Sequence, residues 1–216
     1  MLCPVVQSGL KIGHKQDVFQ KILLPEVNTV LWERSMPHFL EAWAAELNWE
    51  KVLPLSAELA LSDLVDFEQS LRAEIRGWRK REPDMAAWVA ADMRELVERF
   101  ILQTGAQEVV AKIEPVTTDM CRLFHTDKNK LRMLCSYLGQ GTILLSNDAV
   151  AREFLGQGDN DTIIKDPSGI SKLNTLDVVI LKGESWPGNL VGGSVHRSPP
   201  LRVGERRILF KVDYLC

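Results

Sequence analysis

Cysteine is scarce in this 216-residue chain, which contains four in all and no Cys-x-x-Cys pair. Cys3, Cys121, Cys135 and Cys216 therefore form neither a dense disulfide framework nor a zinc-ribbon pattern. The first ten residues also lack the basic segment and apolar run of a secretory leader. We therefore expect a protein that works in the reducing cytoplasm.

Long apolar runs and an excess of one charge are missing as well. No stretch approaches the roughly 18 apolar residues that a membrane-spanning helix needs. The formal net charge is only -3 at pH 7, and neither half carries a basic surface of the kind that binds nucleic acid or membranes. We therefore expect a small-molecule or other substrate as the partner, and neither a nucleic acid nor a membrane.

The first half of the chain has a helical period. The clearest segment begins at Asp84 and closes at Gly105, and its apolar residues recur at spacings of three and four. Residues 36–49 and 63–80 also suit amphipathic helices, whereas residues 24–34 favour no element clearly. The apolar positions of the clearest segment are Trp88, Val89, Met93, Leu96, Val97, Phe100 and Ile101.

The second half changes to short runs of branched and aromatic residues separated by clusters of Gly, Asn, Asp and Pro, which is typical of strands and turns. Helices followed by strands, without alternation of the two, favour an α+β fold. We predict a helical N-terminal region at 1–107, packed as a layer on a C-terminal barrel or jelly roll at 108–216, within one integrated domain. The expected strands are 108–116, 131–138, 142–145, 176–182 and 206–215.

Two of the four histidines lie in the strand-rich half and carry the chemistry. In the segment CRLFHTD, His125 and Asp127 are two residues apart, so on an extended chain their side chains leave the same face. His196 follows Gly192 and Gly193, which permit a close approach of the backbone. A buried carboxylate needs a partner or a cation, and two imidazoles with one carboxylate form the facial triad that holds non-haem Fe(II).

Simpler interpretations of these residues stay open. His125 and Asp127 can form a structural hydrogen bond that orients a loop, and Cys121, His125 and Cys135 can be combined into a zinc site. The cationic residues that follow alternate opposite to Asp127, which predicts a solvated face or a surface that attracts an anionic substrate. These residues are Lys128, Lys130 and Arg132.

The order of these motifs resembles two known groups of proteins. CRLFHTD, LRMLCSYLGQGT and GGSVHRSPP are similar to the domain-of-unknown-function family 1826 over most of the chain. More distantly, an HxD motif, a strand-rich stretch and a histidine about ten residues before an arginine resemble the Fe(II)- and 2-oxoglutarate-dependent oxygenases. That resemblance implies a double-stranded β-helix with His125, Asp127 and His196 as iron ligands.

The same resemblance implies that an arginine near the start of the last strand binds the distal carboxylate of 2-oxoglutarate. Arg206 shares strand parity with the apolar Ile208 and Phe210, which favours it for the barrel interior, and Arg207 is the alternative. Tyr137 lies on the His125 face if the strand register is unbroken, where its hydroxyl would bind a co-substrate carboxylate.

Three functional hypotheses follow from these residues. The resemblance implies an oxygenase that decarboxylates 2-oxoglutarate oxidatively and hydroxylates a bound substrate. The second hypothesis is a cupin-like protein that binds a metal without turnover and serves metal homeostasis. The third is an interaction module, which predicts an exposed apolar patch on the helical half.

Overall fold

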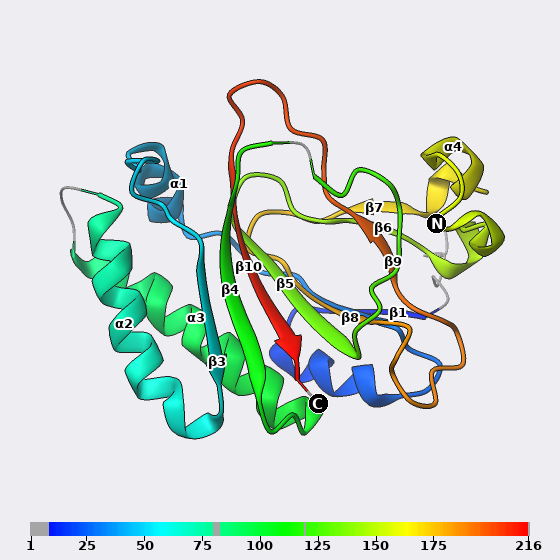
Figure 1. Cartoon of the computed structure of the whole chain (residues 1–216), viewed down its shortest axis with the longest axis horizontal. Coiled ribbons are helices and arrows are strands. Elements are labelled where there is room, and N and C mark those ends of the chain that lie inside the picture. The colour runs from blue at the N-terminus through cyan, green and yellow to red at the C-terminus, as the bar shows by residue number, and fades with distance from the viewer. Residues whose placement is uncertain (1–8, 80–82, 119, 216) are drawn as a thin grey trace.

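The computed structural model describes residues 9–79, 83–118 and 120–215 (Figure 1). Its helices are α1 (His38–Ala45), α2 (Leu64–Gly77), α3 (Pro83–Thr104) and the short α4 (Asn160–Ile163), and a 3-10 helix spans Gln16–Leu23. Its strands are β1 (Leu10–Gly13), β2 (Thr29–Trp32), β3 (Leu55–Leu59), β4 (Val109–Val116), β5 (Leu131–Leu138), β6 (Ile143–Leu145), β7 (Ile170–Lys172), β8 (Val178–Lys182), β9 (Val195–Arg197) and β10 (Arg207–Tyr214).

The strands form two sheets, and the predicted α+β class is confirmed. The larger sheet has seven strands in the order β1-β2-β8-β5-β10-β4-β3, and the smaller has three in the order β7-β6-β9. Neighbouring strands are antiparallel except for the β1–β2 pair. Each strand expected in the second half appears, with bounds that differ by a few residues.

The region at 1–107 contributes more than helices. Its strand β2 pairs with β8, and its strand β3 pairs with β4, so both become part of the large sheet. β2 comes from the segment in which the sequence favoured no element, because four buried or half-buried residues in a row have neither a helical nor an alternating period. The sheet therefore crosses the boundary at residue 107.

The two faces of the large sheet pack against different partners. On one face, Met133 and Tyr137 of β5 and Phe210 of β10 belong to the main core, together with Val97 and Phe100 of α3. On the other face, residues of β2, β5 and β8 pack on Leu144 of the small sheet. The alternation of each strand thus gives one face to the helices and one to the space between the sheets.

Helix α3 ends as the sequence predicts. Gly105 adopts a φ of +72°, which lies in the left-handed region that glycine favours, and its N–H donates to Ile101 O at 3.0 Å. Within the described ranges, no helix combines the length and the apolar character required to cross a lipid bilayer.

Candidate metal centre

The two sequence-predicted histidines meet between the sheets. His125 forms an isolated bridge with His196, in which each backbone N–H donates to the carbonyl oxygen of the other residue at 3.0 Å. His196 lies opposite Leu144 in the register of β9 and β6, so its side chain shares the face of Leu144 toward the large sheet. The ring centroids of the two histidines are 4.6 Å apart.

Gly193 allows this close approach. A Cβ placed at Gly193 would lie 2.6 Å from Glu184 Oε1 and 3.0 Å from Thr126 Cβ, which leaves no room for a larger residue. The segment that carries His125 and Asp127 can therefore lie against the Gly-rich turn before His196, as the sequence indicated.

Both imidazoles are held in the tautomer that a metal ligand needs. His125 Nδ1 lies 2.9 Å from Leu123 O, and His196 Nδ1 lies 3.1 Å from Ser194 O. A carbonyl oxygen only accepts, so each Nδ1 carries the proton and donates it. Each Nε2 is then left with a lone pair, which is the usual arrangement when a backbone carbonyl orients a metal-binding histidine.

Asp127 completes the cluster with one unpartnered oxygen. Its Oδ2 is buried and has no hydrogen-bond partner among the described residues. One ligand atom from each of His125, Asp127 and His196 lies within 4.8 Å of the others. The simpler interpretation, a structural hydrogen bond between His125 and Asp127, is not what the structure shows, because His125 Nδ1 donates to Leu123 O and Asp127 Oδ2 has no hydrogen-bond partner among the described residues. His196 Nε2 lies 3.6 Å from Asp127 Oδ2, beyond ordinary hydrogen-bond length. The geometry instead fits a cation held among the three side chains.

Burial sets the charge of His196. Removal from water lowers the pKa of His196 to about 4, and this effect outweighs the attraction of Asp127. The ring is therefore neutral at pH 7, as a ligand imidazole must be.

Arg132 holds the other oxygen of Asp127, a role that the sequence did not predict. Its Nη1 donates to Asp127 Oδ1 at 2.7 Å, and its Nε donates to Asp213 Oδ1 at 2.6 Å. Only 22% of the Arg132 side chain is exposed, so its assignment to a solvated face with Lys128 and Lys130 was wrong. Bends between Asp127 and the start of β5 break the alternation on which that assignment depended.

A cavity adjoins the cluster on the inner face of the large sheet. Its lining includes both histidines, Arg132, Lys211 and Thr142, with apolar walls from Leu134 and Leu209. Lys211 Nζ pairs with Glu114 Oε1 at 2.7 Å. Glu114 also lines the cavity, and Arg132 is paired with Asp127 and Asp213. The cavity therefore joins the histidines of the candidate metal centre to paired charges and apolar walls.

The two candidate arginines lie in different surroundings, since Arg207 begins β10 and Arg206 precedes it. Arg206 is exposed, and its guanidinium lies 5.0 Å from the ring centroid of Trp49. The expectation that Arg206 points into the interior was wrong, because Arg206 is exposed, and Ile208 and Phe210, with which it shares parity, face the helices. Arg207 is only 1% exposed and lies on the inner face with Leu209, which lines the cavity.

Some hydrogen-bond donors of the Arg207 guanidinium group have no partner among the described residues. Its Nη2 donates to Ser136 Oγ at 3.0 Å, whereas Nε and Nη1 have no hydrogen-bond partner among the described residues. Burial lowers the pKa of Arg207 to about 10, so the guanidinium stays charged at pH 7. A buried cation with two free donors is a ready partner for a carboxylate.

Tyr137 and Cys135 are turned away from the cluster. Tyr137 belongs to the helix-facing core, and its hydroxyl donates to Asp92 of α3, so the prediction that it shares the His125 face was wrong. Cys135 lies on the same helix-facing side, with its thiol directed to Leu176 O. The zinc alternative with Cys121 and His125 therefore fails, because the sheet separates its ligands.

One protein family matches almost the whole chain. The model of a family described as Protein of unknown function (DUF1826) matches residues 13–213. No curated protein matches the sequence significantly.

Solved structures of oxygenases are among those similar to the chain. HygX of Streptomyces hygroscopicus with iron bound is 10% identical with a TM-score of 0.43, over 93% of this chain and 87% of that one. A Neurospora crassa protein in complex with alpha-KG and thymine is 10% identical with a TM-score of 0.43, over 95% and 84%. A prolyl-4-hydroxylase of Pseudomonas putida is 11% identical with a TM-score of 0.40, over 92% and 97%. Likeness at this level leaves the chemistry to be argued from the site.

Proposed function

We propose an activity for this chain, which belongs to the family described as Protein of unknown function (DUF1826). The description of that family names no activity, so the proposal is argued from the site. The protein would be a non-haem Fe(II)- and 2-oxoglutarate-dependent oxygenase that hydroxylates a small-molecule or other organic substrate. The observation that carries the proposal is the convergence of His125, Asp127 and His196 beside a cavity on the inner face of the large sheet. In this proposal the two facing sheets are the double-stranded β-helix of that superfamily, and the protein works in the cytoplasm.

The metal would be held by His125 Nε2, His196 Nε2 and Asp127 Oδ2. The fit is supported by the two Nδ1–carbonyl contacts, which leave both Nε2 atoms free, and by the buried, unpartnered Oδ2. Two imidazoles and one carboxylate suit Fe(II) and leave room for further ligands. Bound there, iron and 2-oxoglutarate together would supply the oxidising power for hydroxylation.

The chain's own residues would position the reactants. Arg132 holds Asp127 Oδ1 and so keeps Oδ2 directed at the metal position. Leu134 and Leu209 give the cavity apolar walls, which limit access of water. Arg207, with Ser136 beside it, would bind the distal carboxylate of 2-oxoglutarate through its free Nε and Nη1 donors.

Metal content and co-substrate binding test the proposal together. We expect protein purified without chelators to carry about one iron per chain, and anaerobic addition of Fe(II) and 2-oxoglutarate to produce a weak visible charge-transfer band. His125→Ala should lose both signals while the far-UV circular dichroism stays that of the folded protein. Folded wild-type protein with no metal and no band would overturn the proposal and favour the interaction module.

Release of succinate separates an oxygenase from a metal-binding protein without turnover. We expect Fe(II)-loaded protein to convert 2-oxoglutarate to succinate, with slow uncoupled turnover where the primary substrate is absent. Stoichiometric iron without succinate release in the presence of a broad substrate panel would favour the role in metal homeostasis.

The two adjacent arginines provide a matched test of the co-substrate site. Arg207→Met should raise the apparent Kd for 2-oxoglutarate by about 10-fold or more, because a charge-assisted contact to a carboxylate contributes about 1.5–3 kcal/mol. Arg206→Met makes the same chemical change one residue away, on the exposed face, and should leave that Kd unchanged. Iron binding measured in both variants shows whether any loss is confined to the co-substrate.

A further inference from the structure

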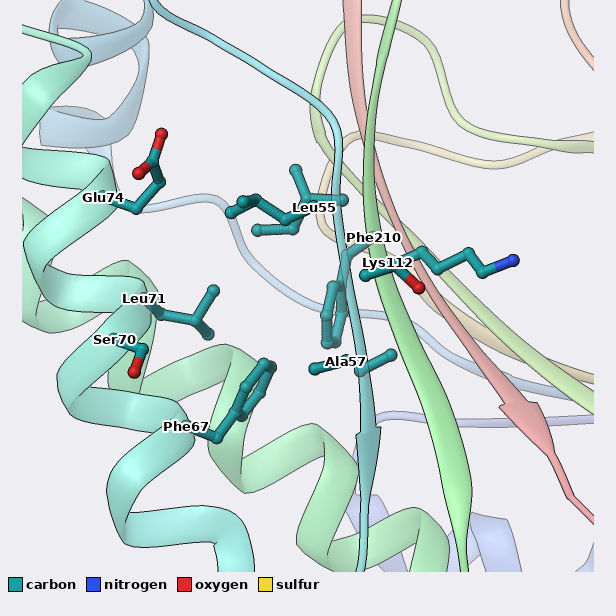
Figure 2. Close-up of a pocket in the computed structure, with 11 residues that line it drawn as sticks. Leu55, Ala57, Phe67, Ser70, Leu71, Glu74, Lys112 and Phe210 are labelled. Carbon is teal, nitrogen blue, oxygen red and sulfur yellow. The ribbon is translucent and has the colours of Figure 1, made fainter.

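An apolar groove lies on the helical half, between α2 and the large sheet (Figure 2). One wall is the edge strand β3, through Leu55 and Ala57, and the other is the face of α2 that carries Phe67 and Leu71. The floor is formed by residues on the helix-facing side of the large sheet, including Phe210. The sheet therefore stands between this groove and the cavity beside His196.

The β3 wall offers unpaired backbone. β3 is the last strand of the seven-stranded sheet and pairs with β4 alone. No further backbone hydrogen bond joins its residues, Leu55–Leu59, to another part of the described chain. Half of the N–H and C=O groups of such a strand point away from the sheet, which makes an edge strand a template for another extended chain.

The α2 wall adds apolar contacts and a charge. Phe67, Leu71 and Glu74 follow one another at spacings of four and three, and Ser70 precedes Leu71; all four lie on the side of α2 that faces β3 (Figure 2). Glu74 is half-buried, and among the described residues its carboxylate has neither a hydrogen bond nor an ion pair. Lys112 cannot neutralise it, because its side chain extends to the far side of the sheet (Figure 2). The groove therefore carries one uncompensated negative charge.

The groove has room for the side chains of an extended chain, with a volume of about 250 Å³. An open edge strand beside an apolar slot is the arrangement in which an extended peptide adds a strand and inserts alternate side chains.

We propose that the groove between β3 and α2 binds an extended peptide segment of a partner protein, which pairs with the free edge of β3, inserts apolar side chains between Phe67 and Leu71, and places a lysine or arginine against Glu74. This interaction is independent of the oxygenase activity. It gives the protein a docking site for a protein partner on the face opposite the candidate active site.

A peptide selection tests the proposal and needs no identified partner. A displayed library of random heptapeptides is selected on the full-length protein and counter-selected on Ser70→Trp, whose indole fills the groove from an exposed position. We expect enriched sequences with apolar residues at alternate positions and one basic residue. Gln69→Trp places the same side chain on the exposed side of α2 away from the groove, and should bind these peptides like the wild type.

Two measurements on an enriched peptide identify the mode of binding. Glu74→Lys should weaken binding by about 10-fold, and added salt, which weakens binding to the wild type, should strengthen binding to the variant because it screens the repulsion between like charges. N-methylation of the peptide at every second residue should abolish binding in one register and leave it intact in the other, since an added strand donates alternate N–H groups to its neighbour. Circular dichroism of each protein variant verifies its fold.

Other outcomes would overturn the proposal. One is a selection in which no peptide is enriched on the wild type relative to Ser70→Trp. The other is that enriched peptides still bind after N-methylation in either register. Binding of an apolar amine such as dodecylamine to wild type but not to Ser70→Trp, with no peptide enriched, would identify a small-molecule pocket instead.

Discussion

At the scale of single residues, Arg132 links two carboxylates with different roles. It donates to Asp127, a candidate metal ligand, and to Asp213 on β10, which also accepts from Asn129 Nδ2 at 3.0 Å. A carboxylate with one oxygen already engaged has a single oxygen left for a cation. Arg132 therefore fixes the orientation of the ligand oxygen without being a ligand itself.

Loss of this contact should weaken metal binding. We expect Arg132→Met to raise the Kd for Fe(II) by about 10–100-fold, the usual effect of removing a group that orients a ligand. Lys128→Met removes the same charge from an exposed position one residue after Asp127 and should leave the Kd unchanged. An anaerobic competition titration with a chromophoric chelator measures both. Equal affinities in the two variants would show that Arg132 does not orient the ligand oxygen.

The two described cysteines should differ sharply in reactivity. Burial raises the pKa of Cys135 to about 12, and its side chain is 1% exposed, whereas Cys121 is exposed. At pH 8 we expect iodoacetamide to alkylate Cys121 in the folded protein and to reach Cys135 only after addition of denaturant. Peptide mapping by mass spectrometry locates the modified residues. Alkylation of Cys135 at the rate of Cys121 would contradict its place in the core.

At the scale of elements, β10 shows how one strand serves two environments. Ile208, Phe210 and Val212 join the core shared with the helices, while Leu209 and Lys211 line the cavity beside the candidate metal centre. A strand that is buried on both faces has no clean polar and apolar alternation. For this reason strand parity predicted correctly which residues of β10 share a face, but not which of the two faces turns toward the helices.

Helix α3 should contribute to stability through a single face. Phe100 is fully buried in the main core, whereas Leu102, two residues later, is 63% exposed. We expect Phe100→Ala to lower the free energy of unfolding by about 3–5 kcal/mol, through lost burial and the cavity left behind. Leu102→Ala should change it by less than about 0.5 kcal/mol. Urea unfolding followed by circular dichroism gives both values, and similar losses in the two variants would contradict this packing.

At the scale of the whole molecule, the chain is joined across residue 107 by more than the sheet. Asp92 of α3 accepts from Arg34 Nη2 at 2.9 and 3.0 Å, and also from the hydroxyl of Tyr137 on β5. Removing one partner of a buried network of this kind costs several kcal/mol of stability. The contacts favour the interpretation that the two regions at 1–107 and 108–216 fold as one unit.

We therefore expect a single cooperative unfolding transition. Five of the six tryptophans lie before residue 107, so tryptophan fluorescence reports mainly on the first region, and protection of the β5 and β8 amides from hydrogen exchange reports on the second. The two urea midpoints should coincide. A fragment of residues 1–107 should be unfolded, because β2 and β3 lose their partner strands. Separate midpoints, or a cooperative transition in the fragment, would contradict a single unit.

The sequence by itself determined the α+β class, the long helix that Gly105 ends and the five later strands, and it singled out the three residues that meet in the candidate metal centre. These features depend on local period and on spacing within a segment, which can be read directly from the chain. His125 and Asp127 are neighbours along the chain, and the glycines before His196 indicate a close approach.

Only the tertiary structure decided what depends on which face a strand turns inward. In the folded protein Arg207, and not Arg206, is buried on the side between the sheets, and Tyr137 contacts α3. Arg132 binds Asp127, and β2 and β3 from the first half pair into the large sheet. Each of these outcomes follows from contacts between residues far apart in the chain or across a bend, and a strand with apolar side chains on both faces does not specify them locally.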